Sequence, residues 1–226
     1  MIEIYFDQQA DQMALPKISH AQTGQDVLAE FILRRSNKIP RDKKYRGRYV
    51  DVGACYPIRA SNTYYFYERG WKGLCVDANP ATKKTFKKFR PRDRFRAEAV
   101  GETEGRMEFF TYTNPQWNSF DPERAVRKKD QLTGSYHIPI RPLSQMIEET
   151  KFQKIDLLSI DTEGFELQVL KSLDLDTYRP SLLLFECIRS IDALHEDEAV
   201  LFALENGYKT VAATGHDVFM LDTRDD

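Results

Sequence analysis

The stretch RYVDVGACYP, residues 48–57, decides the fold of this chain. Tyr49, Val50 and Val52 form a short run of β-prone apolar residues, and Gly53 ends it. This composition predicts a buried parallel strand that is followed by a tight turn. A glycine at the carboxyl end of such a strand lets the backbone approach a ligand closely, and the carboxylate of Asp51 can accept hydrogen bonds from that ligand.

A second apolar run, GLCV at 73–76, ends in another acid, Asp77. Nucleoside-binding folds hold the ribose hydroxyls with an acid at the end of their second strand. The alternative is that Asp51 caps a turn and Asp77 caps the next helix, with no ligand involved. The dinucleotide fingerprint G-x-G-x-x-G is absent, because Cys55 and Ile58 stand where further glycines would be. Its absence disfavours NAD and FAD.

Composition indicates one soluble α/β domain. Apolar residues make up 41% of the chain and charged residues 30%, and the net charge of −2 gives no attraction to nucleic acid or membrane. No apolar run approaches the roughly 20 residues of a membrane span, and no signal-peptide core precedes the domain. The three cysteines are too few and too scattered for a disulfide framework. We expect a cytoplasmic protein with a single domain at 1–226 and an N-terminal helical extension at about 1–47.

Strand-like and helix-like segments alternate along the chain. Strands are predicted at 48–53, 73–76, 95–100, 105–112, 137–141, 155–160 and 182–185, and a terminal hairpin at 208–213 and 218–221. This alternation predicts a doubly wound, mostly parallel sheet. Residues 113–135 contain several Asn, Pro and Gly residues, so we expect a long loop that could cover a site.

Acids gather at one predicted edge of this sheet. The strand ends carry Asp51, Asp77, Glu98, Asp161 with Glu163, and Glu186, and the last turn carries His216. Ligands of open parallel sheets bind beyond the carboxyl ends of the strands, so these residues predict a site there. Glu166 lies one turn into a helix and is expected to be structural. Residues 83–96 include eight basic residues and only one acid. This excess indicates a solvated helix surface or, alternatively, a patch for an anionic substrate.

Six sequence blocks resemble the FkbM family of S-adenosylmethionine-dependent methyltransferases. They are QTGQD at 22–26, VDVGA at 50–54, SNTY at 61–64, GWKG at 70–73, DANP at 77–80 and IDTEGFE at 160–166. The resemblance implies a Rossmann-like class I methyltransferase fold of about seven strands, with an antiparallel strand of the last hairpin inside the sheet. It also implies S-adenosylmethionine as cofactor and a hydroxyl of a sugar or natural product as methyl acceptor.

The same resemblance assigns residues to the cofactor. The turn at Asp51, Gly53 and Ala54 would approach its methionine part, and Asp77 with Ala78 would hold the ribose. The remaining cofactor-site residues are assigned on the same ground: Asn62 of the S-N-T block, Glu98 and Ala99 beside the adenine, and Asp161 at the methionine end and the substrate. Ser159 stands where relatives frequently have Lys.

Catalysis would need a group that takes the proton of the acceptor hydroxyl, worth roughly 10²–10⁴-fold in rate. The candidates at this edge are Asp161, Glu163, Glu186, His137 and His216. Asp161 and Glu186 could alternatively hold a divalent cation, although we expect no metal. The rival functions are an NAD-type oxidoreductase and a non-catalytic binding domain of the same fold. The expected partner is a small-molecule or saccharide acceptor, with homo-oligomerisation left open.

Overall fold

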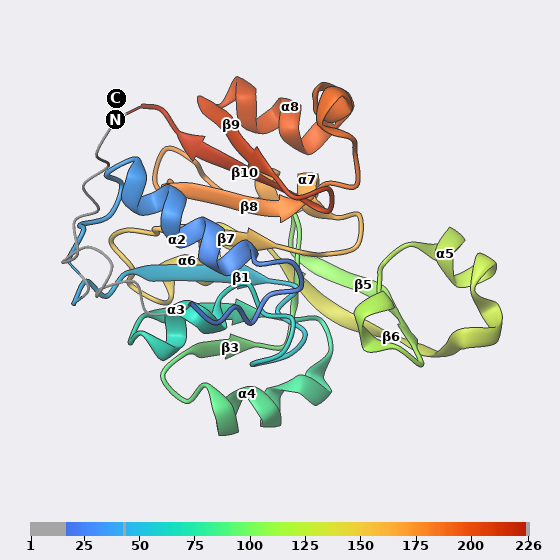
Figure 1. Ribbon diagram of the computed structural model, residues 1–226. Helices are drawn as coiled ribbons and strands as arrows, with labels where there is room; N and C mark the ends of the chain where they lie inside the picture. The colour runs from blue at the N-terminus through green and yellow to red at the C-terminus, as the bar shows by residue number, and fades with distance from the viewer. Residues whose placement is uncertain (1–16, 43, 225–226) are drawn as a thin grey trace, which may run out of the picture.

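Seven strands form the main sheet of the computed structural model, which describes residues 17–42 and 44–224 (Figure 1). Their order is β3-β2-β1-β7-β8-β10-β9; β10 pairs antiparallel with both β8 and β9, and all other neighbouring strands pair in parallel. Their bounds are β1 Arg48–Val52, β2 Lys72–Val76, β3 Arg94–Arg96, β7 Leu157–Ile160, β8 Leu182–Glu186, β9 Tyr208–Ala213 and β10 Asp217–Asp222. The predicted α/β fold, with its internal antiparallel strand, is confirmed.

The central strand β1 pairs in parallel with β2 on one side and with β7 on the other. Its side chains alternate between the two faces of the sheet, as the pleat requires. Val50 and Val52 pack into the core on one face, and Tyr49 packs into the core on the other. Both faces are covered, and three of the five residues of the strand are apolar.

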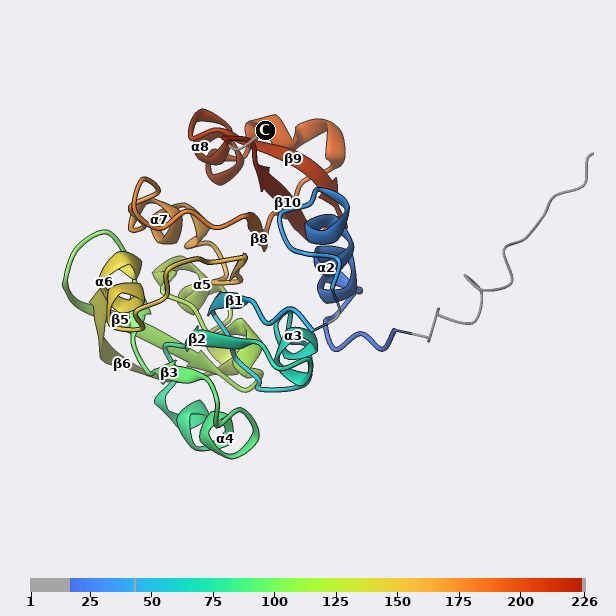
Figure 2. The same ribbon diagram turned by 90° about the vertical axis from the view of Figure 1, so that its left-hand side faces the viewer.

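Helices cover the two faces of the sheet in separate layers (Figure 2). Helices α2, α3 and α4 supply buried residues to the core that contains Tyr49, and α6, α7 and α8 supply them to the core that contains Val50. Their bounds are α2 Gln25–Arg35, α3 Tyr64–Glu68, α4 Lys83–Phe89, α6 Leu143–Glu148, α7 Glu166–Lys171 and α8 Glu198–Glu205, with the 3-10 turns η1 Pro80–Thr82 and η4 Ile191–Glu196. None of the helices in the described part of the chain has the length and apolar character needed to cross a membrane.

A second, three-stranded sheet projects from the carboxyl ends of the main strands (Figure 1). It consists of β4 Ala99–Val100, β5 Gly105–Tyr112 and β6 Leu132–Arg141, in the order β4-β6-β5. The single strand predicted at 95–100 is therefore wrong, because the chain leaves the main sheet after β3 and enters the small sheet at β4. The long loop predicted at 113–135 contains η2 Pro115–Trp117, α5 Pro122–Arg127 and η3 Lys129–Gln131 before β6 begins.

The predicted N-terminal extension is described only from residue 17 onward, and residues 1–16 lie outside the described part. Within it, α2 begins at Gln25, after Gly24 in a left-handed conformation, and packs against β8 and α3. The assignment of the whole chain to one domain stays a prediction.

Candidate active site

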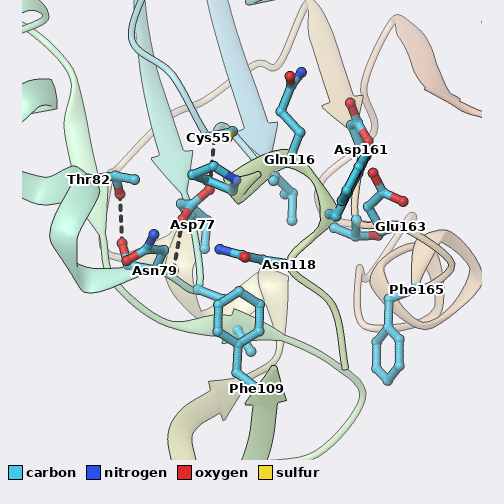
Figure 3. A pocket seen from close by; sticks show the side chains of 18 of the residues that line it. Cys55, Asp77, Asn79, Thr82, Phe109, Gln116, Asn118, Asp161, Glu163 and Phe165 are labelled. Carbon is cyan, nitrogen blue, oxygen red and sulfur yellow. Dashed lines mark hydrogen bonds between the residues drawn. The ribbon is translucent and has the colours of Figure 1, made fainter. Parts of the chain in front are cut away.

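A cavity of about 280 Å³ lies where the carboxyl ends of the central strands meet the small sheet. The turn after β1, the ends of β2 and β7, β4 and the loop after β5 all contribute to its wall. Figure 3 shows Asp77 and Asn79 on one side of this cavity and Asp161 and Glu163 on the other, with Gln116 and Asn118 reaching in from the loop. Of the predicted site residues, the cavity brings together Gly53, Asp77, Ala78, Glu98, Ala99, Asp161, Glu163 and Glu186.

Asp77 joins the turns that follow β1 and β2. Its Oδ2 accepts a hydrogen bond from the Cys55 N–H and its Oδ1 accepts one from the Asn79 N–H, both at 2.8 Å. Burial raises the pKa of this carboxyl to about 6, although the two backbone donors act in the opposite direction. Each oxygen keeps further acceptor capacity, so the side chain can still receive hydroxyl donors from a ligand in the cavity.

Gly53 makes the close contact between the β1 turn and β7 possible. Its φ of 81° lies in the left-handed region, and a Cβ at this position would lie 1.7 Å from the carbonyl oxygen of Asp161. The N–H groups of Gly53 and Ala54 donate to the Val76 carbonyl at 2.9 and 3.1 Å, which ties the same turn to β2. Only glycine fits here, and the primary reason is the packing of backbone against backbone.

Three carboxylates converge on the other side of the cavity. One oxygen each of Asp161, Glu163 and Glu186 lie within 4.8 Å of one another. Burial, followed by repulsion from Glu163, raises the pKa of Glu186 to about 7. Burial, followed by repulsion from Glu186, raises the pKa of Asp161 well above its usual range. Carboxyls whose pKa is raised in this way can take up a proton more readily than exposed ones, which suits proton transfer.

Arg124 of α5 balances part of this charge. Its Nη1 lies 2.6 Å from Oε2 of Glu163, and both side chains are about a quarter exposed. Glu163 has a φ of 58°, which turns the chain between β7 and α7 toward the arginine. Sequence reasoning missed Arg124, because nothing in the sequence shows that a loop 39 residues away reaches this turn.

Glu166 is the first residue of α7 and does not lie one turn into the helix, but its contacts agree with the structural role that was expected. Its Oε1 accepts hydrogen bonds from the Thr162 N–H at 2.9 Å and the Thr162 hydroxyl at 2.8 Å. A third, longer bond of 3.3 Å comes from the Gly164 N–H. The last acid of the IDTEGFE block therefore holds the turn that carries Asp161 and Glu163.

The loop after β5 covers the cavity, and Trp117 and Phe120 belong to its wall. Phe120 is held between Phe109 and Phe165, with ring centroids 4.9 and 5.3 Å away. Lys128 lies over the Trp117 ring at 3.9 Å. The prediction of a covering loop agrees with this position, but its aromatic residues were not singled out, although a Trp between turn residues is a signal for them.

Three residues that were assigned to the cofactor lie elsewhere. Asp51 is buried, accepts a hydrogen bond of 2.5 Å from the Thr63 hydroxyl, and lies 3.8 Å from the Arg90 guanidinium. Ala54 is buried in the core on the same face. Asn62 donates to the Ser159 hydroxyl at 3.2 Å. Within the described part of the chain these side chains do not line the cavity, so a direct contact with a ligand there is not supported.

The two histidines proposed as bases are also outside the cavity wall. His137 is exposed on β6, opposite Glu108 of β5. His216 is exposed in the turn before β10, where its backbone carbonyl accepts from the Cys187 N–H at 2.8 Å. Both side chains are exposed and neither belongs to the cavity wall, so their assignment as proton acceptors gains no support from the structure and stays a prediction.

The acidic residues of the cavity wall favour a positively charged cofactor over one that carries phosphates. Five carboxylate residues line it, and among the described residues no Lys or Arg does. Such a wall attracts the sulfonium and ammonium groups of S-adenosylmethionine and repels the diphosphate of NAD. Asp77 lines the cavity directly after β2, where a carboxylate could accept hydrogen bonds from a ribose diol. The residues present therefore fit the cofactor of a methyltransferase better than a dinucleotide.

The strand order, with β10 antiparallel between β8 and β9, is that of the class I methyltransferase fold. The sequence model of the methyltransferase FkbM domain matches residues 51–210, and the chain belongs to this family. No curated protein has a sequence that matches this chain.

Solved structures of similar fold include a methyltransferase FkbM from Methylobacillus flagellatus, 15% identical over 83% of this chain and 46% of that chain, with a TM-score of 0.48. The chain thus spans about half the length of that protein. A precorrin-6y C5,15-methyltransferase from Geobacter metallireducens is 13% identical over 94% of this chain and 95% of that chain, with a TM-score of 0.48. An O-methyltransferase from Bacillus cereus, in complex with S-adenosylhomocysteine, is 11% identical over 96% of both chains, with a TM-score of 0.41.

Proposed function

We propose that this chain is an S-adenosylmethionine-dependent methyltransferase that methylates a hydroxyl oxygen of a sugar or natural product. The acidic cavity is the observation that carries the proposal, because it combines a ribose acceptor, Asp77, with a carboxylate cluster around Asp161. The family supports methyl transfer. The choice of oxygen as acceptor atom rests on the resemblance described above. The proposed cytoplasmic location rests on the sequence composition alone.

Asp77 would hold the ribose hydroxyls, and Glu98 and Ala99 would border the adenine together with Phe109. All four residues line the same part of the wall, near the start of the small sheet. Asp161 would face the methionine end. These assignments leave the space beside Trp117 for the acceptor.

Bound S-adenosylmethionine would supply an already activated methyl group. The chain then has to align the acceptor oxygen, exclude water and take up one proton. Burial raises the pKa of Glu186 to about 7, and we propose that a carboxylate oxygen of this residue accepts the proton. Glu163, held at 2.6 Å by Arg124, would orient the acceptor hydroxyl.

The first test is calorimetric binding of S-adenosylhomocysteine in the presence and absence of NADH. The proposal requires binding that NADH does not displace. Displacement by NADH would favour the oxidoreductase, and no binding of S-adenosylhomocysteine would favour a non-catalytic domain. A positive result is followed by transfer of labelled methyl groups to a panel of glycosides and hydroxylated natural products.

The second test concerns Glu163. In Glu163→Gln we expect a lower kcat with a nearly unchanged dissociation constant for S-adenosylhomocysteine, because the carboxylate would act on the acceptor and not on the cofactor. Methyl transfer at the wild-type rate would remove Glu163 from the mechanism. Loss of cooperative unfolding would instead show that the Glu163–Arg124 pair holds the loop in place.

A further inference from the structure

A second hollow lies at the opposite end of the main strands, at the amino ends of β1, β2 and β3. Its volume is about 520 Å³. Its wall is formed by residues 45–48, the start of β2, residues 92–94, and the segment 150–156 that leads into β7. Figure 2 looks onto this edge of the molecule. We call this hollow the basic groove.

The basic groove is lined by seven basic residues and one acid. The basic residues are Arg46, Arg48, Lys72, Arg92, Arg94, Lys151 and Lys154. The acid, Asp156, is buried and already satisfied, because it accepts from the Tyr45 hydroxyl at 2.9 Å and the Arg48 N–H at 2.9 Å and pairs with Lys154 at 3.0 Å. It therefore has little capacity left to neutralise the other cations.

Most of the arginines are oriented but not neutralised. Arg48 donates to the Gly47 carbonyl at 3.0 Å, Arg92 donates to the Tyr67 carbonyl at 2.5 Å, and Arg94 donates to the Glu149 carbonyl. A carbonyl oxygen holds a guanidinium in place and leaves its positive charge, and its remaining N–H donors, available. Lys72 and Lys151 are exposed, and no carboxylate in the described part of the chain pairs with either.

The charge is segregated within a molecule whose net charge is only −2. The cavity at the carboxyl ends has five acids in its wall and the basic groove has seven bases in its wall. Like charges held around one hollow repel one another, and the field that they focus attracts an anion of opposite charge. A hollow of this size falls within the roughly 300–1,000 Å³ of small-molecule sites. Arginine side chains match phosphate oxygens with paired donors.

We propose that the basic groove binds a small molecule that carries a diphosphate group. Lys72, Arg94 and Lys151 all line the groove and together offer enough donors for two neighbouring phosphates. The inference is independent of the proposed methyl transfer, because no residue of the groove lines the acidic cavity. The proposal also accounts for part of the basic stretch 83–96. Arg92 and Arg94 of this stretch line the groove, whereas the lysines of α4 are exposed to solvent.

The test is calorimetric binding of inorganic pyrophosphate to the full chain, at low and at physiological ionic strength. We expect wild-type binding that weakens with salt, and a loss of about tenfold in affinity in the double variant Lys72→Ala/Lys151→Ala, which removes two exposed positive charges from the groove. The matched control is Lys84→Ala/Lys87→Ala on α4, which removes the same charge outside the groove and should bind within about twofold of wild type. Both variants should unfold cooperatively. If wild-type protein binds S-adenosylhomocysteine, both variants should bind it with the same affinity.

Equal pyrophosphate affinity in the groove variant and the control would overturn the proposal, as would absence of binding to a wild-type chain that unfolds cooperatively. A single-stranded oligonucleotide that binds far more tightly than pyrophosphate, and loses affinity in the groove variant, would show a polymer-binding surface and would also overturn it. Neither result depends on methyl transfer, so failure here leaves the proposed function standing.

Discussion

Asp77→Asn separates a ligand-binding role of this residue from a structural one. The substitution keeps the size and one acceptor oxygen but removes the charge. A hydrogen bond to a charged acceptor contributes about 1.5–3 kcal/mol, so loss of one ribose contact of this kind should weaken S-adenosylhomocysteine binding by about 10- to 150-fold. The measurement is made at pH 8, where a carboxyl with a pKa of about 6 is ionised in the wild-type protein.

The same substitution should leave the folded state nearly as stable. The Cys55 and Asn79 N–H groups each lose a charged acceptor, and one of them can keep the amide oxygen. In the other direction, a pKa raised from 3.8 to about 6 means that holding the charge of Asp77 in the buried site costs about 3 kcal/mol, which the amide avoids. The two effects are of similar size and opposite sign, so we expect the free energy of unfolding to change by less than about 1.5 kcal/mol.

The assay is calorimetry for binding and urea denaturation for stability, with Asp197→Asn as the matched control. Asp197 also accepts two backbone N–H groups, from Ala199 and Val200 at 2.9 and 3.1 Å, but it caps α8 outside the cavity. Asparagine is an equally good cap, so neither binding nor stability should change in the control. If Asp77→Asn binds S-adenosylhomocysteine as tightly as the control does, the assignment of Asp77 to the ribose is refuted.

Two further changes test the surroundings of the cavity. Arg90→Met should destabilise the protein by about 3–5 kcal/mol in urea denaturation, because it removes the cation that contacts the buried carboxylates of Asp51 and Asp93; an unchanged midpoint would contradict this. Glu186 has a folded pKa of about 7, above its usual 4.5, so its contribution to stability is fully present below about pH 4.5 and is lost as the pH rises through 7. Glu186→Gln should therefore flatten the fall in unfolding free energy across this window, and an identical fall in both proteins would show that Glu186 does not titrate there.

Much of the fold could be predicted because its signals are local. The apolar runs of β1, β2 and β7 each end in an acid or a glycine, and parallel strands bring those ends to one edge. Asp77, Asp161 and Glu163 could be placed at the cavity by this rule alone. The same rule cannot tell which strand leaves the sheet, so the split between β3 and β4 and the separate small sheet were not predicted.

Contacts between segments that lie far apart in the sequence were the main features that could not be predicted. Arg124 reaches Glu163 from a loop whose path no local pattern describes, and Arg90 was counted among solvated basic residues although it is fully buried. Its guanidinium donates to the Thr63 hydroxyl at 2.8 Å, to the Tyr49 hydroxyl at 2.9 Å and to Asp93 at 2.7 Å. A buried arginine is stable only when such partners converge, and their convergence is a property of the tertiary structure.

The sequence contained a signal for the burial of Asp51 away from the cavity wall. Side chains of a strand alternate between faces, so Asp51 must share the face of Tyr49 and lie opposite to Val50 and Val52. That face is covered by α2, α3 and α4, and an acid there needs buried donors from them and their connecting segments. Such donors were available in the S-N-T block that precedes α3.

The S-N-T block acts as the polar link between β1, β7 and α4. Its three side chains each have a different buried or half-buried partner: Ser61 accepts from Arg90 at 3.2 Å, Asn62 donates to Ser159 at 3.2 Å and Thr63 donates to Asp51 at 2.5 Å. These contacts fix the segment between the β1 turn and α3, and thereby the turn at Gly53 that borders the cavity. Residues 61–63 do not line the cavity, so any contribution that this block makes to the proposed cofactor site is through the backbone that it positions.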